Sequence, residues 1–371
     1  MTSTTSTLER SAQPSMGDAR NSHAAPVSAV RADAVQEFRD AAEHMDSAVL
    51  GGPKVWSLTD LAQKSGLSIE DVQDYWRWIG IPNRDPNERM YTDADLGALH
   101  ELLALSASEH FNETVTRNFV RGLGHMAERL ATWQVEAMVD HIGHLRSLDD
   151  LDARLAVVDE MPHLMDTLTR QLDHAWKRQL AAVTRRLTVE VAESSDDVDK
   201  TRHLPLRRAV GFADIVGFTE STRSMSTDQL ARYMQSFETR VRDAVTEAGG
   251  RVIKMVGDAV FFAADSVEVG AEVALRVAVP GEIQPVRVSM VWCRVLTRFG
   301  DMFGPGVNLA SRLAELSQPD EVTVDPHTAS LLEATGRYTL DELPEAEIQG
   351  MGTMKPVRLR YAPHHYAQNH Y

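Results

Sequence analysis

The chain has 371 residues, of which 43% are hydrophobic and 25% are charged. This length suggests about two domains, and the composition excludes a collagen-like, mainly disordered or mainly membrane-embedded protein. The formal net charge of -16 opposes non-specific binding to nucleic acid or anionic membranes, because it repels phosphate at long range. The single cysteine, Cys293, excludes an intrachain disulfide and a cysteine-rich zinc site, which favours a reducing cytoplasm.

The first segment, residues 1–30, is rich in Ser, Thr, Ala and Pro and lacks the apolar block of a signal peptide. We expect a disordered tail there and a second tail at 364–371. Nowhere do about 18 apolar residues follow one another, so no membrane span is expected. A cytoplasmic location is therefore predicted.

Residues 31–191 show a helical pattern, which predicts an all-α domain. Turns are expected at Gly51-Gly52, Gly66, Gly80 and Pro162. From Met165 to Val191, apolar residues recur every three or four positions, which predicts a long amphipathic helix. These residues are Leu168, Leu172, Trp176, Leu180, Val183 and Leu187. The stripe packs either within its own domain or in a coiled coil across a dimer, and the sequence leaves both open. A polar linker is expected at 192–204.

Residues 205–363 change to a mixed pattern. Strands are predicted at 207–218, 251–264 and 286–292, the second divided into a hairpin at Gly257-Asp258. Helices are predicted at 230–245, 266–279 and 307–316. The order β-α-β-β-α-β is typical of a ferredoxin-like α/β sandwich. The predicted fold class is α+β, with an all-α N-terminal domain followed by this sandwich.

Two carboxylates stand at the ends of predicted strands. The segment FADIVGFT (212–219) delivers Asp214 to a strand end, and Asp258 occupies the tip of the next hairpin. Each alone would be an ordinary turn residue, but adjacent central strands would bring both to one edge. Paired acids can hold two divalent cations about 3.5–4 Å apart. The backbone amides from Ile215 to Thr219 could receive a triphosphate, so the segment indicates a nucleotide–metal site.

Three segments resemble the signature motifs of the class III nucleotidyl cyclase catalytic domain: FADIVGFT, IKMVGDAVFF (253–262) and FGDMFGPGVNLASRL (299–313). The resemblance covers about residues 207–362. It implies a head-to-tail homodimer that forms cyclic AMP and pyrophosphate from ATP at sites shared by both subunits. The metal-binding acids of the family match Asp214 and Asp258, with the Ile215 carbonyl as a further ligand, which implies two Mg²⁺ or Mn²⁺ ions per site. Gly217, Phe218 and Thr219 match the substrate-binding turn.

The same resemblance assigns two pairs to the other subunit. Its base-selecting pair matches Lys254 and Asp301, and its transition-state pair matches Asn308 and Arg312. Asp301 can accept from adenine N6 while Lys254 donates to N1, whereas guanine would mismatch both contacts, so ATP is predicted over GTP. Arg312 would meet the charge that grows on the phosphoryl oxygens, and Asn308 would orient the ribose. No general base is assigned.

Two departures from the family pattern stand out. Ser289 and Cys293 occupy positions at which the family commonly has glycine, which leaves the local turn geometry open. The phosphate-binding lysine of the family has no unambiguous match, and Lys355 is a candidate only. Trp292 is expected to be a packing residue.

The helical half contains a second resemblance. Residues 55–82, followed by MYTDADLGAL, resemble the helix-turn-helix of MerR-type regulators. The helix expected to contact DNA carries one basic residue, Arg77, and three acidic ones: Glu70, Asp71 and Asp74. This charge balance disfavours nucleic-acid binding and favours a helical regulatory domain. The alternative function is a DNA-binding regulator whose degenerate cyclase domain senses nucleotide, and retention of all six cyclase side chains argues against it.

Histidines offer the helical half a means of pH control, since this side chain titrates near neutral pH. Eight lie between residues 31 and 191: His44, His100, His110, His125, His141, His144, His163 and His174. Each taken singly is an ordinary surface or packing residue. Regulation by pH through this domain is a hypothesis at this stage.

Overall fold

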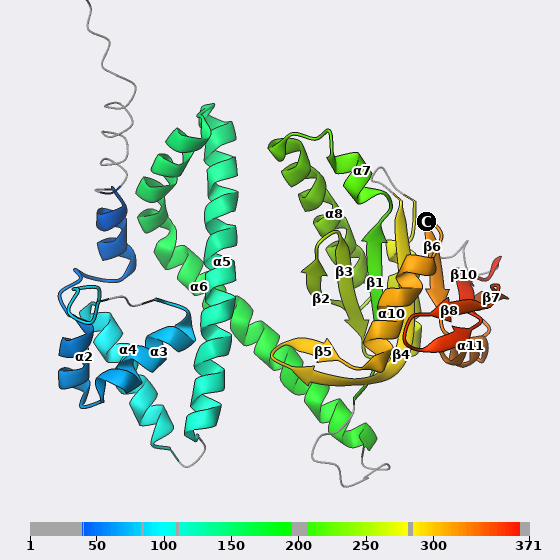
Figure 1. Ribbon diagram of the computed structural model, residues 1–371, viewed down its shortest axis with the longest axis horizontal. Helices are drawn as coiled ribbons and strands as arrows, with labels where there is room; N and C mark the ends of the chain where they lie inside the picture. Colours follow the sequence, from blue (N-terminus) through cyan, green and yellow to red (C-terminus); the bar gives the residue numbers. More distant parts are fainter. Residues whose placement is uncertain are drawn as a thin grey trace, which may run out of the picture. The chain divides into compact units, whose positions relative to one another are not determined.

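The computed structural model describes residues 39, 41–82, 85–108, 111–194, 206–280 and 285–363. The predicted tails at 1–30 and 364–371 lie outside these residues, as does most of the predicted linker at 192–204. The chain forms two compact units, residues 1–180 and 181–371. Helices build the described part of the first unit and a large sheet lies in the second, which confirms the mixed α+β class (Figure 1). No described helix is long and apolar enough to cross a bilayer.

The first unit is made of helices whose ends carry clear capping signals. After a helical segment at 41–49 come α2 (Leu58–Ser65), α3 (Ile69–Ile79), α4 (Asp93–Ser106), α5 (Glu113–Arg146) and α6 (Asp150–Ser194). Ser57 forms a reciprocal capping box with Asp60 at the start of α2. Gly66 and Gly80 end α2 and α3 in the left-handed conformation, which confirms the predicted turns at both glycines.

Helix α6 is longer than predicted, because it begins at Asp150 rather than near Met165. Pro162 lies inside this helix, so the predicted turn at this residue is wrong. A proline removes one backbone donor and normally ends or kinks a helix. Here the neighbouring Met161 is buried in a cluster with Val139 and Ile142 of α5, and this packing holds α6 on both sides of the interruption.

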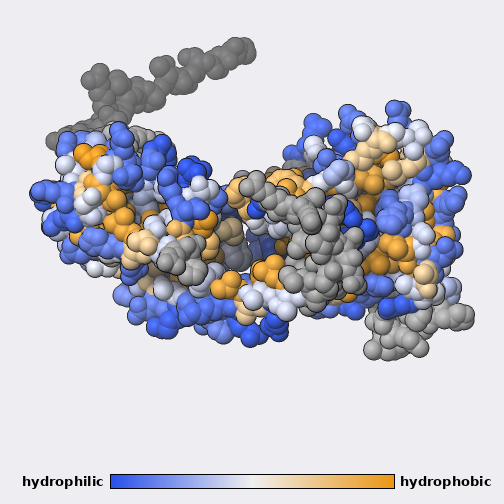
Figure 2. Space-filling view, turned by 90° about the horizontal axis from the view of Figure 1, so that it is seen from below, coloured by the Kyte–Doolittle hydropathy of each residue, from blue (hydrophilic) through white to orange (hydrophobic). Residues whose placement is uncertain are grey.

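The apolar stripe of α6 is largely uncovered in the described part of the chain. Trp176 is 58% exposed and Leu187 is 53% exposed. Helix α5 carries a second row of exposed apolar side chains: Phe119, Leu123, Met126 and Trp133. Figure 2 shows hydrophobic surface interrupting the hydrophilic surface of the chain. Neighbours in the α6 row are three or four residues apart, and the α5 row follows the same spacing except for a seven-residue step from Met126 to Trp133, as on one face of a helix.

The second unit contains every strand and helix predicted up to residue 316. Its elements are β1 (Leu206–Ile215), α7 (Phe218–Thr222), α8 (Thr227–Glu247), β2 (Arg251–Val256), β3 (Ala259–Ala264), α9 (Val267–Val277), β4 (Val286–Arg298), β5 (Asp301–Phe303), α10 (Pro305–Leu316), β6 (Glu321–Val324), α11 (Pro326–Glu333), β7 (Tyr338–Glu342), β8 (Ala346–Ile348), β9 (Gly352–Met354) and β10 (Val357–Tyr361). The main sheet has the order β2-β3-β1-β4-β6-β10-β7, and β5 pairs with the far end of β4. β4 and β6 are parallel, whereas β1 is antiparallel to both β3 and β4.

The two faces of this sheet are covered by different elements. On one face, Val288 and Met290 of β4 join a core with residues of α8, α9 and α11. On the other face, Val291 joins a core with α10 and the β8–β9 hairpin. Strand side chains alternate between faces, so the odd-numbered residues of β4 look toward α10, which lies across the sheet in Figure 1. The predicted site residues are distributed around this second face and the adjoining sheet edge.

Candidate active site

Asp214 and Asp258 meet at one edge of the sheet, as the predicted strand pairing requires. Asp214 pairs with Ala259 across β1 and β3, which places it beside the turn that carries Asp258. The Ile215 amide donates to the Asp258 carbonyl over 3.4 Å, which links the end of β1 to this turn. Burial, and next the charge of Asp258, raise the pKa of Asp214 above the usual aspartate value. The two carboxylates therefore interact before any ligand arrives.

Arg287 is a cation at this edge that the sequence analysis did not assign. It pairs with Asp214 across β1 and β4, so both side chains project from the same face of the sheet. The Arg287 charge lowers the pKa of Asp214 against the larger effect of burial. Its buried Nε has no hydrogen-bond partner among the described residues. In the sequence, Arg287 is one residue of the predicted strand at 286–292. Only the pairing of this strand with β1 shows that Arg287 lies opposite Asp214.

The turn after β1 presents backbone amides beside Asp214. The Val216 amide is already bonded to the Pro285 carbonyl at 2.9 Å, so it is engaged within the fold rather than facing a ligand. Gly217 adopts a left-handed conformation with φ 68° and begins α7, which runs from Phe218 through Thr219 to Thr222. The first amides of a helix lack intrahelical acceptors. The amides suited to a phosphate are thus those of residues 217–219.

Tyr233 of α8 lies behind this turn and was also missed from the sequence. Its ring stacks with Phe218 at a centroid distance of 6.2 Å. Burial and the charge of Asp258 raise the pKa of Tyr233. Its hydroxyl is buried and has no hydrogen-bond partner among the described residues. In sequence Tyr233 is one more position on the apolar face of α8, and nothing there signals its nearness to an acid.

Lys254 and Asp301, 47 positions apart in sequence, form a direct ion pair. Lys254 lies on β2 and Asp301 begins β5, the short strand that folds back on the end of β4. The Asp301 carboxylate also accepts from the Met302 amide at 2.8 Å, which fixes its orientation. The structure thus brings together the pair that the sequence analysis assigned to the purine base.

Asn308 and Arg312 both lie on α10, one helical turn apart. Asn308 is exposed in the first turn and Arg312 is partly exposed. The Arg312 guanidinium is paired with Glu315 at 2.8 Å. The negative charge of Glu315 is also felt at Asp214, where it raises the pKa. An exposed pair of this kind holds its arginine weakly, so the guanidinium can turn to a stronger anion.

Cys293 and Lys355, two of the residues singled out where the sequence departs from the family pattern, lie in different environments: Cys293 is partly buried and Lys355 is exposed. Burial raises the pKa of Cys293 to about 11, which leaves its thiol protonated at neutral pH. Trp292 packs against the core on the α8 and α9 side, as expected of a packing residue. Lys355 is exposed and lies 3.7 Å from Glu342, in a loose surface ion pair.

The donor set at the sheet edge fits a hard divalent cation. Among the described residues, no group of three or more His, Cys, Asp or Glu side chains could hold a metal ion. Two carboxylates without a third protein acid are the set that Mg²⁺ typically uses when phosphate oxygens and water complete its shell. Burial, and next the charge of Asp258, raise the pKa of Asp214, so a cation bound between the two acids would favour their ionised forms. Asp214 and Asp258 therefore suit a metal that arrives with a phosphorylated ligand.

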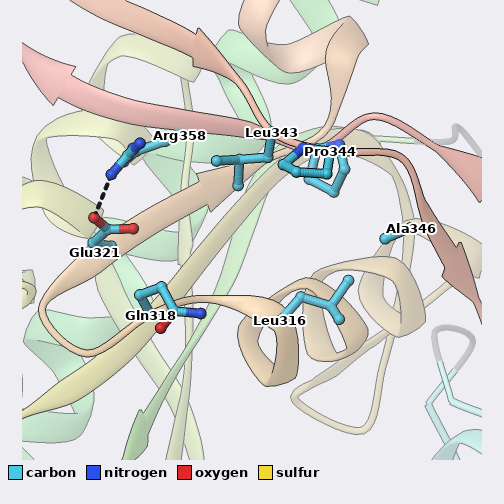
Figure 3. Close-up of a pocket in the computed structure, with 8 residues that line it drawn as sticks. Leu316, Gln318, Glu321, Leu343, Pro344, Ala346 and Arg358 are labelled. Carbon is cyan, nitrogen blue, oxygen red and sulfur yellow. Dashed lines mark hydrogen bonds and ion pairs between the residues drawn. The ribbon is translucent and has the colours of Figure 1, made fainter.

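A separate pocket of about 260 Å³ lies between the end of α10 and the loop after β7. Its lining is formed by Leu316, Gln318, Glu321, Leu343, Pro344, Ala346, Pro356 and Arg358. Figure 3 shows the ion pair that Arg358 and Glu321 form at 2.6 Å on one side of it, opposite Leu316 and Ala346. None of the predicted site residues lines this pocket, so it is not the nucleotide site.

Comparison with known proteins gives a consistent set of relatives. The family model described as "Adenylate and Guanylate cyclase catalytic domain" matches residues 285–360. An adenylate cyclase of Glutamicibacter nicotianae is 31% identical over 335 residues, which cover 87% of this chain and 83% of that protein. Adenylate cyclases of Streptomyces coelicolor and Streptomyces griseus are each 33% identical, over 76% and 82% of this chain and 72% and 74% of their own. The likeness to the first relative thus extends well into the helical unit.

Proposed function

The chain belongs to the adenylate and guanylate cyclase family and is an adenylate cyclase, and from this premise we propose how its residues convert ATP into 3′,5′-cyclic AMP and pyrophosphate. The observation that carries the proposal is the meeting of Asp214 with Asp258 at the sheet edge, beside Arg287. This edge combines two acids, one cation and the amides of the turn at residues 217–219. Such a set can bind a triphosphate together with divalent cations.

Substrate binding places the triphosphate at the sheet edge. Asp214, Asp258 and the Ile215 carbonyl would hold Mg²⁺ or Mn²⁺, two ions per site. When bound, these ions activate the ribose 3′-hydroxyl and neutralise charge on the triphosphate. The amides of Gly217, Phe218 and Thr219 would receive phosphate oxygens at the start of α7, and Arg287 adds a guanidinium on the same face of the sheet.

Cyclisation is an attack of the ribose 3′-oxygen on the α-phosphorus with loss of pyrophosphate. Negative charge grows on the phosphoryl oxygens in the transition state, and Arg312 would leave Glu315 to meet it. Asn308, one turn earlier on α10, would orient the ribose so that the oxygen is aligned for attack. We propose no side chain as general base.

A homodimer is proposed in which each site takes its acids from one subunit and the other two pairs from its partner. The exposed apolar rows of α5 and α6 support association, because rows of this size and spacing are what coiled-coil helices bury against one another. The strand order β2-β3-β1-β4, with α8 and α9 on one face, supports the ferredoxin-like arrangement on which this sharing rests.

The direct test is an assay of the purified full-length chain with ATP and with GTP, each with and without Mg²⁺ or Mn²⁺. We expect cyclic AMP from ATP only when metal is present, and little cyclic GMP. Metal-independent turnover would contradict the roles of Asp214 and Asp258. Equal rates with both nucleotides would contradict the role of the Lys254–Asp301 pair.

Replacing Asp301 with Asn is expected to reduce the preference for ATP over GTP by about 10²-fold, because an amide can either accept from adenine or donate to guanine. The measurement is the ratio of kcat/KM for the two nucleotides. Asp341→Asn serves as the control, since Asp341 pairs with Arg360 on the far strands of the sheet. An unchanged ratio in Asp301→Asn would refute base selection by this residue.

Regulation by the helical unit is proposed on the strength of its shared presence in the relatives and its histidines. In the MerR-like segment, Arg77 of α3 is paired with Asp74, which supports a role other than DNA binding. Histidines gain charge as pH falls from about 8 to 5.5, so the full-length chain should show a pH profile that a fragment of residues 205–371 lacks. Superimposable profiles of cyclic AMP formation would reject pH control.

A further inference from the structure

Helix α10 is joined to β4 by a buried hydrogen bond that lies between its two proposed catalytic side chains. The Ser289 hydroxyl donates to the Ala310 carbonyl over 2.6 Å. Ser289 and Ala310 are both fully buried. Ala310 is midway between Asn308 and Arg312 on the helix, so this is the point of α10 where a displacement would move both side chains.

This hydrogen bond is not needed to satisfy the backbone. In an α-helix the Ala310 carbonyl already accepts from the amide four residues later, and the serine uses its second lone pair. Alanine or glycine at position 289 would leave no buried polar atom without a partner. Because no backbone group depends on it, the contact is an addition to the helix rather than a requirement of it.

A second contact limits how α10 can sit on the same strand. A Cβ atom on Gly306 would lie 2.3 Å from Sγ of Cys293, so the first turn of the helix rests directly on that side chain. Ser289 and Cys293 are both odd-numbered residues of β4, on the face toward α10. Ser289 and Cys293 thus both contact α10 close to Asn308.

We propose that Ser289 is a positioning residue for cyclisation, fixing the place of α10 on β4 and through it the places of Asn308 and Arg312. The inference rests on the proposed function, because it gives these two side chains their role. Ser289 touches neither substrate nor the reacting atoms. Its effect should therefore be on the rate of the chemical step rather than on ATP binding, since a displacement of about 1 Å can cost up to about 10²-fold in rate.

The test compares Ser289→Ala with Ser317→Ala in the full-length chain. Ser317 is a matched control, because its buried hydroxyl also joins α10 to β4, donating to the Val288 carbonyl at 2.9 Å, but it caps the helix beyond Arg312. We expect Ser289→Ala to lower kcat about 10-fold with KM for ATP within about twofold of wild type. Ser317→Ala should lower the melting temperature while kcat stays close to wild type. Ser289→Cys, which keeps a weak donor, should recover part of the lost kcat.

Three results would overturn the proposal: equal loss of kcat in both alanine variants, a loss of melting temperature alone in Ser289→Ala, or a rise in KM alone. Hydrogen exchange of the amides at 306–316 gives a readout that does not depend on turnover. Faster exchange in Ser289→Ala than in Ser317→Ala supports the positioning of α10 by Ser289, and equal exchange refutes it. If the wild type made no cyclic AMP, the proposed function would fail while this comparison still decided whether Ser289 holds α10.

Discussion

Replacing Asp214 with Asn should abolish cyclic AMP formation and, at neutral pH, raise the melting temperature of the metal-free chain. The loss of activity is expected to be at least about 10²-fold, because a metal ligand contributes several kcal/mol to the transition state. The gain in stability follows from the pKa of Asp214, which burial and then Asp258 raise in the folded state. The contribution of this carboxyl to the free energy of unfolding is therefore most favourable where it is protonated, and it falls as pH rises through its folded pKa. Asparagine carries no charge at any pH, so at this position the variant does not lose stability as pH rises through this range.

Thermal melting from pH 3 to pH 8, alongside the cyclase assay, checks both halves of the Asp214 prediction. The difference in melting temperature between variant and wild type should shrink toward the acid end, where Asp214 is protonated in both the folded and unfolded states. Asp265→Asn is the opposite control, because Asp265 is paired with Arg208 and Arg251 and its loss should destabilise the chain. A lower melting temperature for Asp214→Asn at pH 7 would contradict the interpretation.

Mixing two inactive variants should restore activity if each site is shared between subunits. Arg312→Ala alone is expected to lower turnover by about 10²–10³-fold, through loss of the fixed guanidinium. Co-refolded or co-expressed in equal amounts with Asp214→Asn, it should recover about a quarter of wild-type activity, because half of the dimers are mixed and each mixed dimer has one intact site.

The control for complementation is a mixture of Asp214→Asn with Asp258→Ala. Both variants lack an acid of the same set, so no mixed dimer contains an intact site and activity should stay at background. Recovery in this control would place the Asp214 and Asp258 of one site in different subunits. No recovery in the Asp214→Asn and Arg312→Ala mixture, despite dimers seen by sedimentation, would place all six side chains in one subunit.

Much of the sheet around the site could be predicted because local signals coincide with it. The alternation of apolar residues around Asp214 and the Gly257-Asp258 hairpin indicate two neighbouring strands, and the structure pairs them. The prediction for the third strand ended at Trp292, whereas β4 continues to Arg298. Polar and apolar residues are mixed in this extension, and its pairing with β1 up to Val295 and with β5 from Leu296 onward keeps it in strand conformation.

The parts that could not be predicted depend on contacts between distant segments. Pro162 looks like a helix end in the local sequence, but burial of Met161 against α5 carries the helix through it. Arg287 is an ordinary strand residue until its register against Asp214 is known. The same holds for Ser289, whose partner Ala310 lies 21 residues away in the chain. The periodicity of apolar residues shows which face of a helix or strand is buried. It does not show which side chains of two distant segments lie opposite one another.

The length of β4 limits where insertions and deletions can be accommodated in this enzyme. One unbroken run of backbone carries Arg287 beside Asp214 and leads, through the turn at Phe299 and Gly300, to Asp301 beside Lys254. Adding or deleting a single residue within it would turn every later side chain to the opposite side of the sheet. Insertions can therefore be tolerated at the exposed turn, whereas inside the strand only one-for-one replacement keeps both Arg287 beside Asp214 and Asp301 beside Lys254.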